Sequence, residues 1–424
     1  MEHLSIIVIF ILFLCFGLVS KRIDGTVITP PMIFVGAGLL LSEVFFGALN
    51  FQVGHDLLHL LLEATLVLVL FSDAARIDLG ILKRDHNVPQ RMLLAGMPMT
   101  ILLGGAVAYF IPLGLTICEA ALLAAILTPT DAALGQAVVN SKAVPVRIRQ
   151  SLNVESGLND GIALPVILVL ASTASAIATA DMDWFRFAAL QLTFGPLIGV
   201  AVGYLGARFL NHAYARGWVS EAGQGIISLV LAGLSFIIAE ALHGNGFIAA
   251  FVAGLVFGNS LKQPCHYLFE FVETEGQLLT LSAFLIFGAL LLPGALAVFN
   301  PWYWVFALIS LTLLRMLPVA ISLAGIKLKT PTKLFLGWFG PRGLASLLFL
   351  LLVVNETELQ HAETITNVVF IAVLLSVFLH GLSAAPLARL YGGLAATYPG
   401  CEENKQISEM PAMPARMRDA AAET

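Results

Sequence analysis

Runs of roughly twenty predominantly apolar residues recur from one end of the chain to the other, and this pattern constrains the fold more than any other feature. Each run is long enough to cross a hydrocarbon core about 30 Å thick as a helix. Hydrophobic residues make up 58% of the 424 residues and charged residues only 12%, which is too apolar for a water-soluble fold. Because lipid cannot hydrogen-bond free backbone groups, the runs must be helices. The sequence therefore predicts an all-α polytopic membrane protein.

We count about thirteen spans, with boundaries good to a few residues. They fall at about 3–20, 26–43, 57–75, 92–115, 117–139, 151–178, 184–208, 224–243, 246–259, 277–297, 301–325, 334–354 and 365–388. The first lacks a preceding Lys or Arg and a small-residue cleavage site, so we expect it to be retained. We expect residues 1–390 to form one transmembrane unit and residues 391–424 to be a short, disordered cytosolic tail.

Positive charge follows the odd-numbered spans, whereas the alternate loops carry almost none. The residues concerned are Lys21, Arg22, Arg76, Lys83, Arg84, Arg91, Lys142, Arg147, Arg149, Arg208, Arg216, Lys262, Lys327, Lys329 and Lys333. By the positive-inside rule these loops and the C-terminus face the cytosol, and the N-terminus faces out. We therefore expect a multi-pass protein of the plasma (inner) membrane.

Two spans are interrupted in mid-membrane. Span five contains Thr128-Pro129-Thr130-Asp131, and span twelve contains Gly340-Pro341-Arg342-Gly343. Proline removes a backbone donor and clashes with the preceding turn, so carbonyls are freed at both places. The two spans are seven apart, and an odd offset makes equivalent spans run in opposite directions. We therefore expect two inverted six-helix repeats around span seven, with a transport site where the interrupted helices meet.

Span six carries the residues that are most costly to place in a membrane, in the segment Glu155-Ser156-Gly157-Leu158-Asn159-Asp160-Gly161. Residues four apart share a helical face, so Ser156 lies over Asp160 and Glu155 over Asn159. A charge near the bilayer centre costs roughly 3 kcal/mol on insertion scales, so such a group indicates a function. We predict that Asp160 is the working carboxylate.

Depth brings the charged groups together. Asp131, Asp160 and Arg342 each lie about nine residues from the cytosolic end of their spans, which is roughly 13 Å deep at 1.5 Å per residue. Arg342 needs a partner at that depth, and Glu155 is the nearest candidate by level. We expect an ion pair between Arg342 and Glu155 with a structural role.

The cluster suits a hard monovalent cation. Carboxylates and hydroxyls of Asp160, Asp131, Ser156 and Thr130 add to the carbonyls that an interrupted helix frees, and no Cys or His lies among them. The same carboxylate can hold a cation or a proton. A carrier that reorients with either ligand, but not empty, exchanges one for the other. We expect no cofactor and no enzymatic activity, with the transported Na⁺, K⁺ or Li⁺ and the proton as the ligands.

Other charged residues carry weaker signals. Four stand alone in their spans, where structural pairing or interfacial placement competes with gating or pH sensing: Glu63, Glu119, Glu240 and Arg315. Three lie at the cytosolic end of span three, where we expect them to be solvated: Asp73, Arg76 and Asp78. His243 and His380 are the histidines nearest the membrane, and we expect ordinary hydrogen-bonded side chains.

Taken together, these motifs resemble the signature of the cation:proton antiporters, in the branch that contains archaeal NhaP and the mammalian sodium/proton exchangers. The resemblance covers the span-five and span-six segments in order, Gly340-Pro341-Arg342-Gly343, and a further motif, Gly246-Phe247-Ile248-Ala249-Ala250-Phe251-Val252-Ala253-Gly254-Leu255. It implies a thirteen-helix homodimer with a dimerisation domain and a core domain that moves like an elevator.

The resemblance also implies roles for individual residues. Asp160 would bind cation or proton, with Ser156 and the Thr130 carbonyl as ligands. The other four residues would support the site: Asp131 and Glu155 through water, and Asn159 and Arg342 by holding it together. Asn159, where the electrogenic branch has a second Asp, implies one-for-one electroneutral exchange.

Three other classes compete with an antiporter. An intramembrane protease could use two aspartates to activate water, but its Gly-x-Gly-Asp signature is absent. A cation channel would need a continuous polar pore, and a non-transporting sensor would normally append a signalling domain. The sequence does not choose among Na⁺, K⁺ and Li⁺, and it implies no nucleic-acid partner.

Overall fold

The computed structural model describes residues 2–23, 26–47, 55–77, 79–80, 87–175, 184–262, 266–397 and 403. Within these ranges every regular element is a helix, as predicted. The helices are α1 (Glu2–Ile23), α2 (Pro30–Leu41), α3 (His55–Arg76), α5 (Asn87–Arg91), η1 (Met92–Gly96), α6 (Met97–Phe110), α7 (Ile117–Ile126), α8 (Ala132–Val139), α9 (Val146–Ala174), α10 (Trp184–Ala215), α11 (Glu221–Ala241), α12 (Gly246–Ser260), α13 (His266–Ile286), η2 (Phe287–Leu291), α14 (Leu292–Ala297), α15 (Pro301–Leu311), α16 (Leu313–Ser322), α17 (Thr330–Trp338), α18 (Leu344–Glu356) and α19 (Ala362–Ala396).

In the described part of the chain, eight helical segments are long and apolar enough to cross a membrane, judged by length and composition alone. Besides the two spans with predicted interruptions, three predicted spans are not uniform α-helices. Spans four and ten contain the π-helical turns η1 and η2, which precede Pro98 and Pro293. Because proline cannot donate to the carbonyl one turn back, the hydrogen-bond ladder changes its spacing there. Span eleven is divided at Thr312 into α15 and α16.

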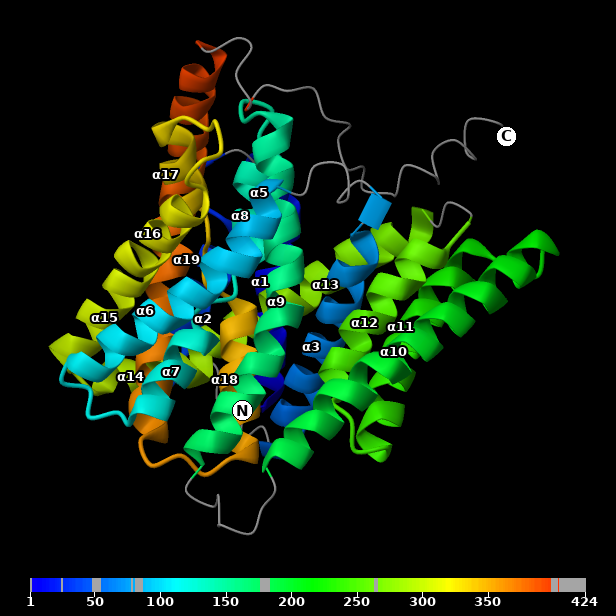
Figure 1. Ribbon diagram of the computed structural model, residues 1–424, viewed down its shortest axis with the longest axis horizontal. Helices are drawn as coiled ribbons and strands as arrows, with labels where there is room; N and C mark the ends of the chain where they lie inside the picture. The colour runs from blue at the N-terminus through cyan, green and yellow to red at the C-terminus, as the bar shows by residue number, and fades with distance from the viewer. Residues whose placement is uncertain are drawn as a thin grey trace.

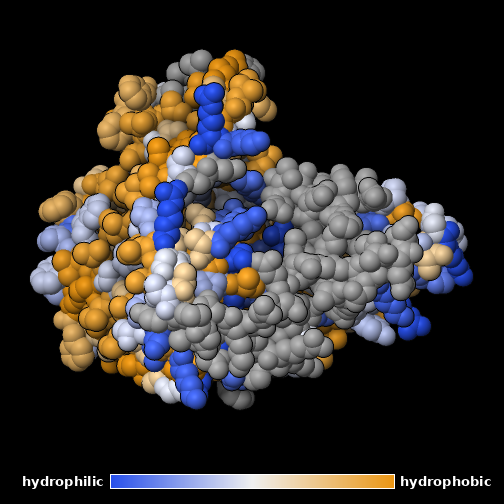
Figure 2. All heavy atoms as spheres, turned by 90° about the horizontal axis from the view of Figure 1, so that it is seen from above, coloured by the Kyte–Doolittle hydropathy of each residue, from blue (hydrophilic) through white to orange (hydrophobic). Residues whose placement is uncertain are grey.

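The helices form two groups that lie side by side (Figure 1). One group contains α3, α10, α11 and α12, and the other contains α6, α7, α15, α16, α17 and α19, with α9 and α18 between them. Figure 2 views the end of the molecule at which α5 and α17 lie, and shows hydrophobic residues covering a large part of the flank beside hydrophilic residues at that end. This distribution suits a protein whose flanks face lipid.

The first group is held together by close backbone contact between α3 and α12. A Cβ on Gly254 would collide with the carbonyl of Phe71, and one on Gly258 would collide with that of Ala75. Two glycines four residues apart therefore let the helix axes approach as they do in membrane bundles with small residues at the interface. The 15-residue helix α12 is also packed against α10 and α11.

The two predicted interruptions are confirmed. Residues 127–131 separate α7 from α8, and residues 339–343 separate α17 from α18. Both segments are buried, so their backbone groups need partners within the protein. The second halves of both interrupted helices, α8 and α18, pack against α9 and against α19 of the second group.

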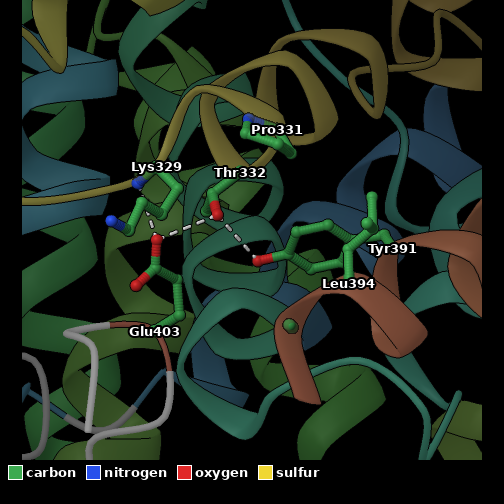
Figure 3. Close-up of a pocket in the computed structure, with 7 residues that line it drawn as sticks. Lys329, Pro331, Thr332, Tyr391, Leu394 and Glu403 are labelled. Carbon is green, nitrogen blue, oxygen red and sulfur yellow. Dashed lines mark hydrogen bonds between the residues drawn. The ribbon is translucent and has the colours of Figure 1, made fainter. Parts of the chain in front are cut away.

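The expected boundary of the C-terminal tail is wrong by about one and a half turns. Helix α19 continues to Ala396, and Tyr391 is buried, stacked on Phe335 of α17 with ring centroids 4.2 Å apart. Glu403 is also buried, and its Oε1 accepts hydrogen bonds from the backbone N of Lys329 at 2.7 Å and from Thr332 Oγ1 at 3.1 Å (Figure 3). The disorder predicted for the rest of the tail concerns residues 398–402 and 404–424, outside the described residues.

Candidate functional site

Asp131 joins the two segments that interrupt the helices, residues 127–131 and 339–343. We call the place where these two extended segments meet the crossing. The backbone N of Asp131 donates to the carbonyl of Pro341 at 2.8 Å, and its Oδ2 accepts from the backbone N of Leu344, the first residue of α18, at 2.7 Å. Its Oδ1 lies 3.4 Å from the backbone N of Leu134 in α8. One carboxylate thus caps the N-termini of both second half-helices, where helix dipoles favour negative charge.

Gly343 permits this contact. A Cβ at this position would collide with the Asp131 carboxylate itself, and the backbone there is buried. The carbonyl end of α7 is satisfied from the same side, because Ser346 Oγ donates to the carbonyl of Ile126 at 2.9 Å. Backbone and side-chain hydrogen bonds therefore connect α7, α8 and α18 at the crossing.

The polar face of α9 contacts this crossing as the sequence predicts. Asn159 Nδ2 donates to Thr130 Oγ1 at 2.6 Å, and Thr130 Oγ1 lies 2.9 Å from Ser156 Oγ. All three side chains are buried. The hydroxyls of Thr130 and Ser156 and the amide of Asn159 thus form one network beside the interrupted helix α7–α8.

Asp160 is buried next to this network, with 8% of its surface exposed. Among the described residues, its Oδ1 has no hydrogen-bond partner. A buried carboxylate oxygen without a donor is costly unless a cation or a proton occupies it. The arrangement therefore provides a position for a positively charged ligand, close to the hydroxyls that could complete its coordination.

Asp73, which the sequence predicts to be solvated, is a charged neighbour of this network. This residue of α3 interacts electrostatically with both Asp131 and Asp160, and its side chain is half-buried. Small residues follow it, in the segment Ser72-Asp73-Ala74-Ala75, and small residues at a helix interface allow close approach. That local composition is the signal that could have identified it. Asp78 lies outside the described residues.

The predicted ion pair between Glu155 and Arg342 is wrong. Glu155 pairs with Arg315 of α16 instead: the Glu155 Oε1 atom lies 2.6 Å from Arg315 NH1, and Glu155 Oε2 accepts from Arg315 NH2 at 2.7 Å. Both side chains are almost fully buried. Arg342 lies in the extended segment, where its side chain does not follow helical phase, and its NH1 donates to the carbonyl of Gly340 at 2.6 Å. Glu155 still acts on Arg342 electrostatically.

Two other lone charges also have structural partners. Glu119 accepts from Thr116 in a capping box at the start of α7, and from the backbone N and Nδ1 of His361 at the start of α19, both at 2.8 Å. Glu240 accepts from the backbone N of Gly246 at 2.7 Å. These contacts favour the structural interpretation of both residues.

A small pocket borders the network. It is lined by Gly135, Val138, Val139, Leu152, Asn153, Ser156, Phe339 and Pro341. Its walls come from α8, α9 and the extended segment before α18, and it lies toward the end of α8 that is expected to face the cytosol. The pocket therefore reaches one ligand of the predicted site, Ser156, from that side.

The chain matches the model of the transmembrane sodium/hydrogen exchanger family over residues 7–390. It is 27% identical over 395 residues to the K(+)/H(+) antiporter NhaP of Alkalimonas amylolytica, covering 91% of this chain and 67% of that protein. It is 25% identical over 371 residues to the K(+)/H(+) antiporter NhaP2 of Shewanella oneidensis, covering 85% and 62%. The chain thus spans about two-thirds of the length of these relatives.

Two further proteins extend the comparison. The Na(+)/H(+) antiporter of Schizosaccharomyces pombe is 26% identical over 356 residues, covering 75% of this chain and 74% of that protein. The structure of the sodium proton antiporter MjNhaP1 from Methanocaldococcus jannaschii superposes with a TM-score of 0.75 at 19% identity, covering 92% of this chain and 99% of that one. The fold is therefore that of MjNhaP1. With a family match over nearly its whole length, the chain belongs to the sodium/hydrogen exchanger family, whose members are transporters and not enzymes.

Proposed function

We propose that this protein is a secondary-active antiporter that exchanges a monovalent cation for a proton, with the two competing for Asp160. The observation that carries the proposal is the buried Asp160 carboxylate, whose Oδ1 has no hydrogen-bond partner among the described residues. Thr130 and Ser156 lie in the adjacent network and supply the oxygens that a hard cation needs. Relatives named as K(+)/H(+) and Na(+)/H(+) antiporters support the same function.

The remaining predicted site residues divide into ligands and supports. Ser156 and the Thr130 carbonyl complete the cation site, and Asn159 holds Thr130 in place. Asp131 and Glu155 act on the cation from a distance, because their carboxylates are engaged by helix N-termini and by Arg315, respectively. Arg342 holds the crossing together. With one exchangeable carboxylate, the exchange is one-for-one and electroneutral.

The proposal also covers the oligomeric state, the membrane and the orientation of the protein. The chain is a homodimer of the plasma (inner) membrane, with the N-terminus outside and the C-terminus in the cytosol. The exposed apolar face of α1, which includes Phe10, Leu14 and Leu18, supports a lipid-facing or subunit-facing role for this helix. The group of α3 and α10–α12 is the static part, and the group that contains the crossing moves against it.

The direct test uses inside-out vesicles with an acid interior, to which Na⁺, K⁺ or Li⁺ is added in turn. The parent protein should alkalinise the interior with at least one cation, and Asp160→Asn should not, since an amide cannot exchange a proton for a cation. Gel filtration of the variant shows whether it is folded. Absence of any response in the folded parent over a wide pH range would overturn the proposal. A current that persists without a proton gradient would indicate a channel instead.

A further inference from the structure

The side chains of α19 that face the second extended segment form a polar row at helical spacing. Ser376 and His380 are almost fully buried, and Ser383 is half-buried one turn further on. Positions i, i+4 and i+7 share one face of a helix, so all three point toward residues 338–343. A buried polar row on a membrane helix is costly unless each member is hydrogen-bonded.

His380 satisfies the carbonyl end of α17. Its Nε2 lies 2.9 Å from the carbonyl of Trp338, the last residue of that helix, and its ring lies against the Trp338 indole with centroids 5.0 Å apart. Trp338 Nε1 in turn donates to Ser383 Oγ at 2.9 Å. Because a carbonyl can only accept, Nε2 carries the proton of the imidazole ring.

Ser376 connects the same ring to the other end of the extended segment. The backbone N of Arg342 donates to Ser376 Oγ at 2.6 Å, and Ser376 Oγ lies 3.2 Å from His380 Nδ1. Nδ1 also lies 3.1 Å from the carbonyl of Ser376. A neutral ring with its proton on Nε2 accepts at Nδ1, and among the described residues the Ser376 hydroxyl is the donor that lies beside it. The hydroxyl therefore accepts from Arg342 and donates to His380.

We propose that Ser376 and His380 are positioning residues for cation transport, which fix the extended segment 339–343 at both of its ends through one continuous set of hydrogen bonds. The segment they hold carries the Pro341 carbonyl that binds Asp131 N and leads into the Leu344 amide that binds Asp131 Oδ2. Asp131 is adjacent to Thr130, a predicted ligand, so a displacement of the segment is transmitted to the cation site. The inference rests on the proposed antiport function.

The test compares four variants in the same vesicles: Ser376→Ala, His380→Leu, His380→Gln and, as a control, Ser235→Ala. Ser235 is also fully buried, but within the part of the chain that the structure describes its hydroxyl bonds only to the carbonyl of Ala232 in its own helix. Loss of one such hydrogen bond corresponds to roughly a three- to tenfold change. Ser376→Ala and His380→Leu should raise the apparent KM for the cation by that factor. His380→Gln has an acceptor oxygen and a donor nitrogen, so its apparent KM should return to the parent value. Ser235→Ala should have the KM of the parent.

Hydrogen exchange of the backbone provides a readout that is independent of transport. Peptides covering residues 339–348 should exchange faster in Ser376→Ala and His380→Leu than in the parent, and His380→Gln should return to the parent rate. Unchanged KM and exchange in Ser376→Ala would overturn the proposal, as would a Gln variant as impaired as the Leu variant. If the parent transports no cation, the antiport function fails, while the exchange rates still decide whether the hydrogen bonds hold the segment.

Discussion

The carboxylates near the centre of this protein differ in how they are neutralised. Glu155 is matched by the guanidinium of Arg315, and Asp131 by backbone amides at two helix N-termini. Asp160 has an oxygen with no donor among the described residues. At the scale of single residues, the structure therefore separates two carboxylates with structural partners from one that is open to a ligand.

The ion pair of Glu155 and Arg315 gives a prediction about stability. Removing one partner leaves a buried charge uncompensated, which costs roughly 3–5 kcal/mol, whereas replacing both with apolar residues is often neutral. Glu155→Leu and Arg315→Met alone should each lower the thermal unfolding temperature in detergent, and the double variant should regain most of the loss. The pair Glu155→Leu with Arg342→Met is the comparison: Arg342 makes no salt bridge with Glu155 and only feels its charge, so this double variant should regain less than the Glu155/Arg315 one. Losses that simply add in the Glu155/Arg315 double variant would contradict the pairing.

At the scale of helices, the proposed function depends on two segments that are not helical, residues 127–131 and 339–343. Their carbonyl and amide ends are satisfied by side chains from other elements: Asp131 for α8 and α18, Ser346 for α7 and His380 for α17. Each interrupted helix therefore depends on residues distant in the sequence for its local geometry. A defect at the crossing affects all four half-helices together.

Gly343→Ala tests this dependence. The added Cβ collides with the Asp131 carboxylate, so either the carboxylate leaves the α18 N-terminus or the segment shifts. We expect a loss of about 1–3 kcal/mol in stability, as for other overpacked sites, and a loss of cation-driven proton movement. Gly233→Ala is a matched control, because a Cβ there meets no atom within 4 Å. Parent-like transport by a folded Gly343→Ala protein would contradict the role of the close contact.

The sequence predicted what local chemistry determines and missed what depends on rotation about a helix axis. Pro129 and Pro341 revealed both interruptions, because proline cannot continue a helix, and Asp160 stood out because a charge in lipid is costly. The sequence indicates how deep a residue lies in the membrane. It does not indicate in which direction a side chain points from a segment that is not helical. The predicted partner of Glu155 is therefore Arg342, whereas the partner in the structure is Arg315. Asp73 was missed because Arg76 one turn later made that end of the span look solvated.

At the scale of the whole molecule, a residue of the tail contacts the second group of helices at the start of α17. Glu403 accepts from the first turn of α17, and Tyr391 of α19 donates to Thr332 Oγ1 at 3.1 Å. The tail thus joins the start of the second interrupted helix to the end of the last helix. This contact lies far along the chain from the predicted cation site.

Truncation distinguishes this contact from the rest of the tail. A chain ending after residue 397 loses Glu403, and a chain ending after residue 405 retains it. We expect the shorter chain, and Glu403→Ala in the full chain, to be cut faster by trypsin at Lys327, Lys329 and Lys333, because the start of α17 is less constrained. The longer truncation should behave like the parent. Equal cleavage rates in all four proteins would contradict a constraint from Glu403.

The open oxygen of Asp160 also bears on how tightly exchange is coupled. A carrier that reorients with this carboxylate bare moves an unbalanced charge through a region of low polarisability, and the self-energy of such an ion is several kcal/mol even after relaxation. Each 1.4 kcal/mol lowers the population of a state tenfold. Under the proposed antiport function, the carboxylate that would hold a cation or a proton would also limit the leak, because a return step with that carboxylate empty is disfavoured by the cost of burying a bare charge.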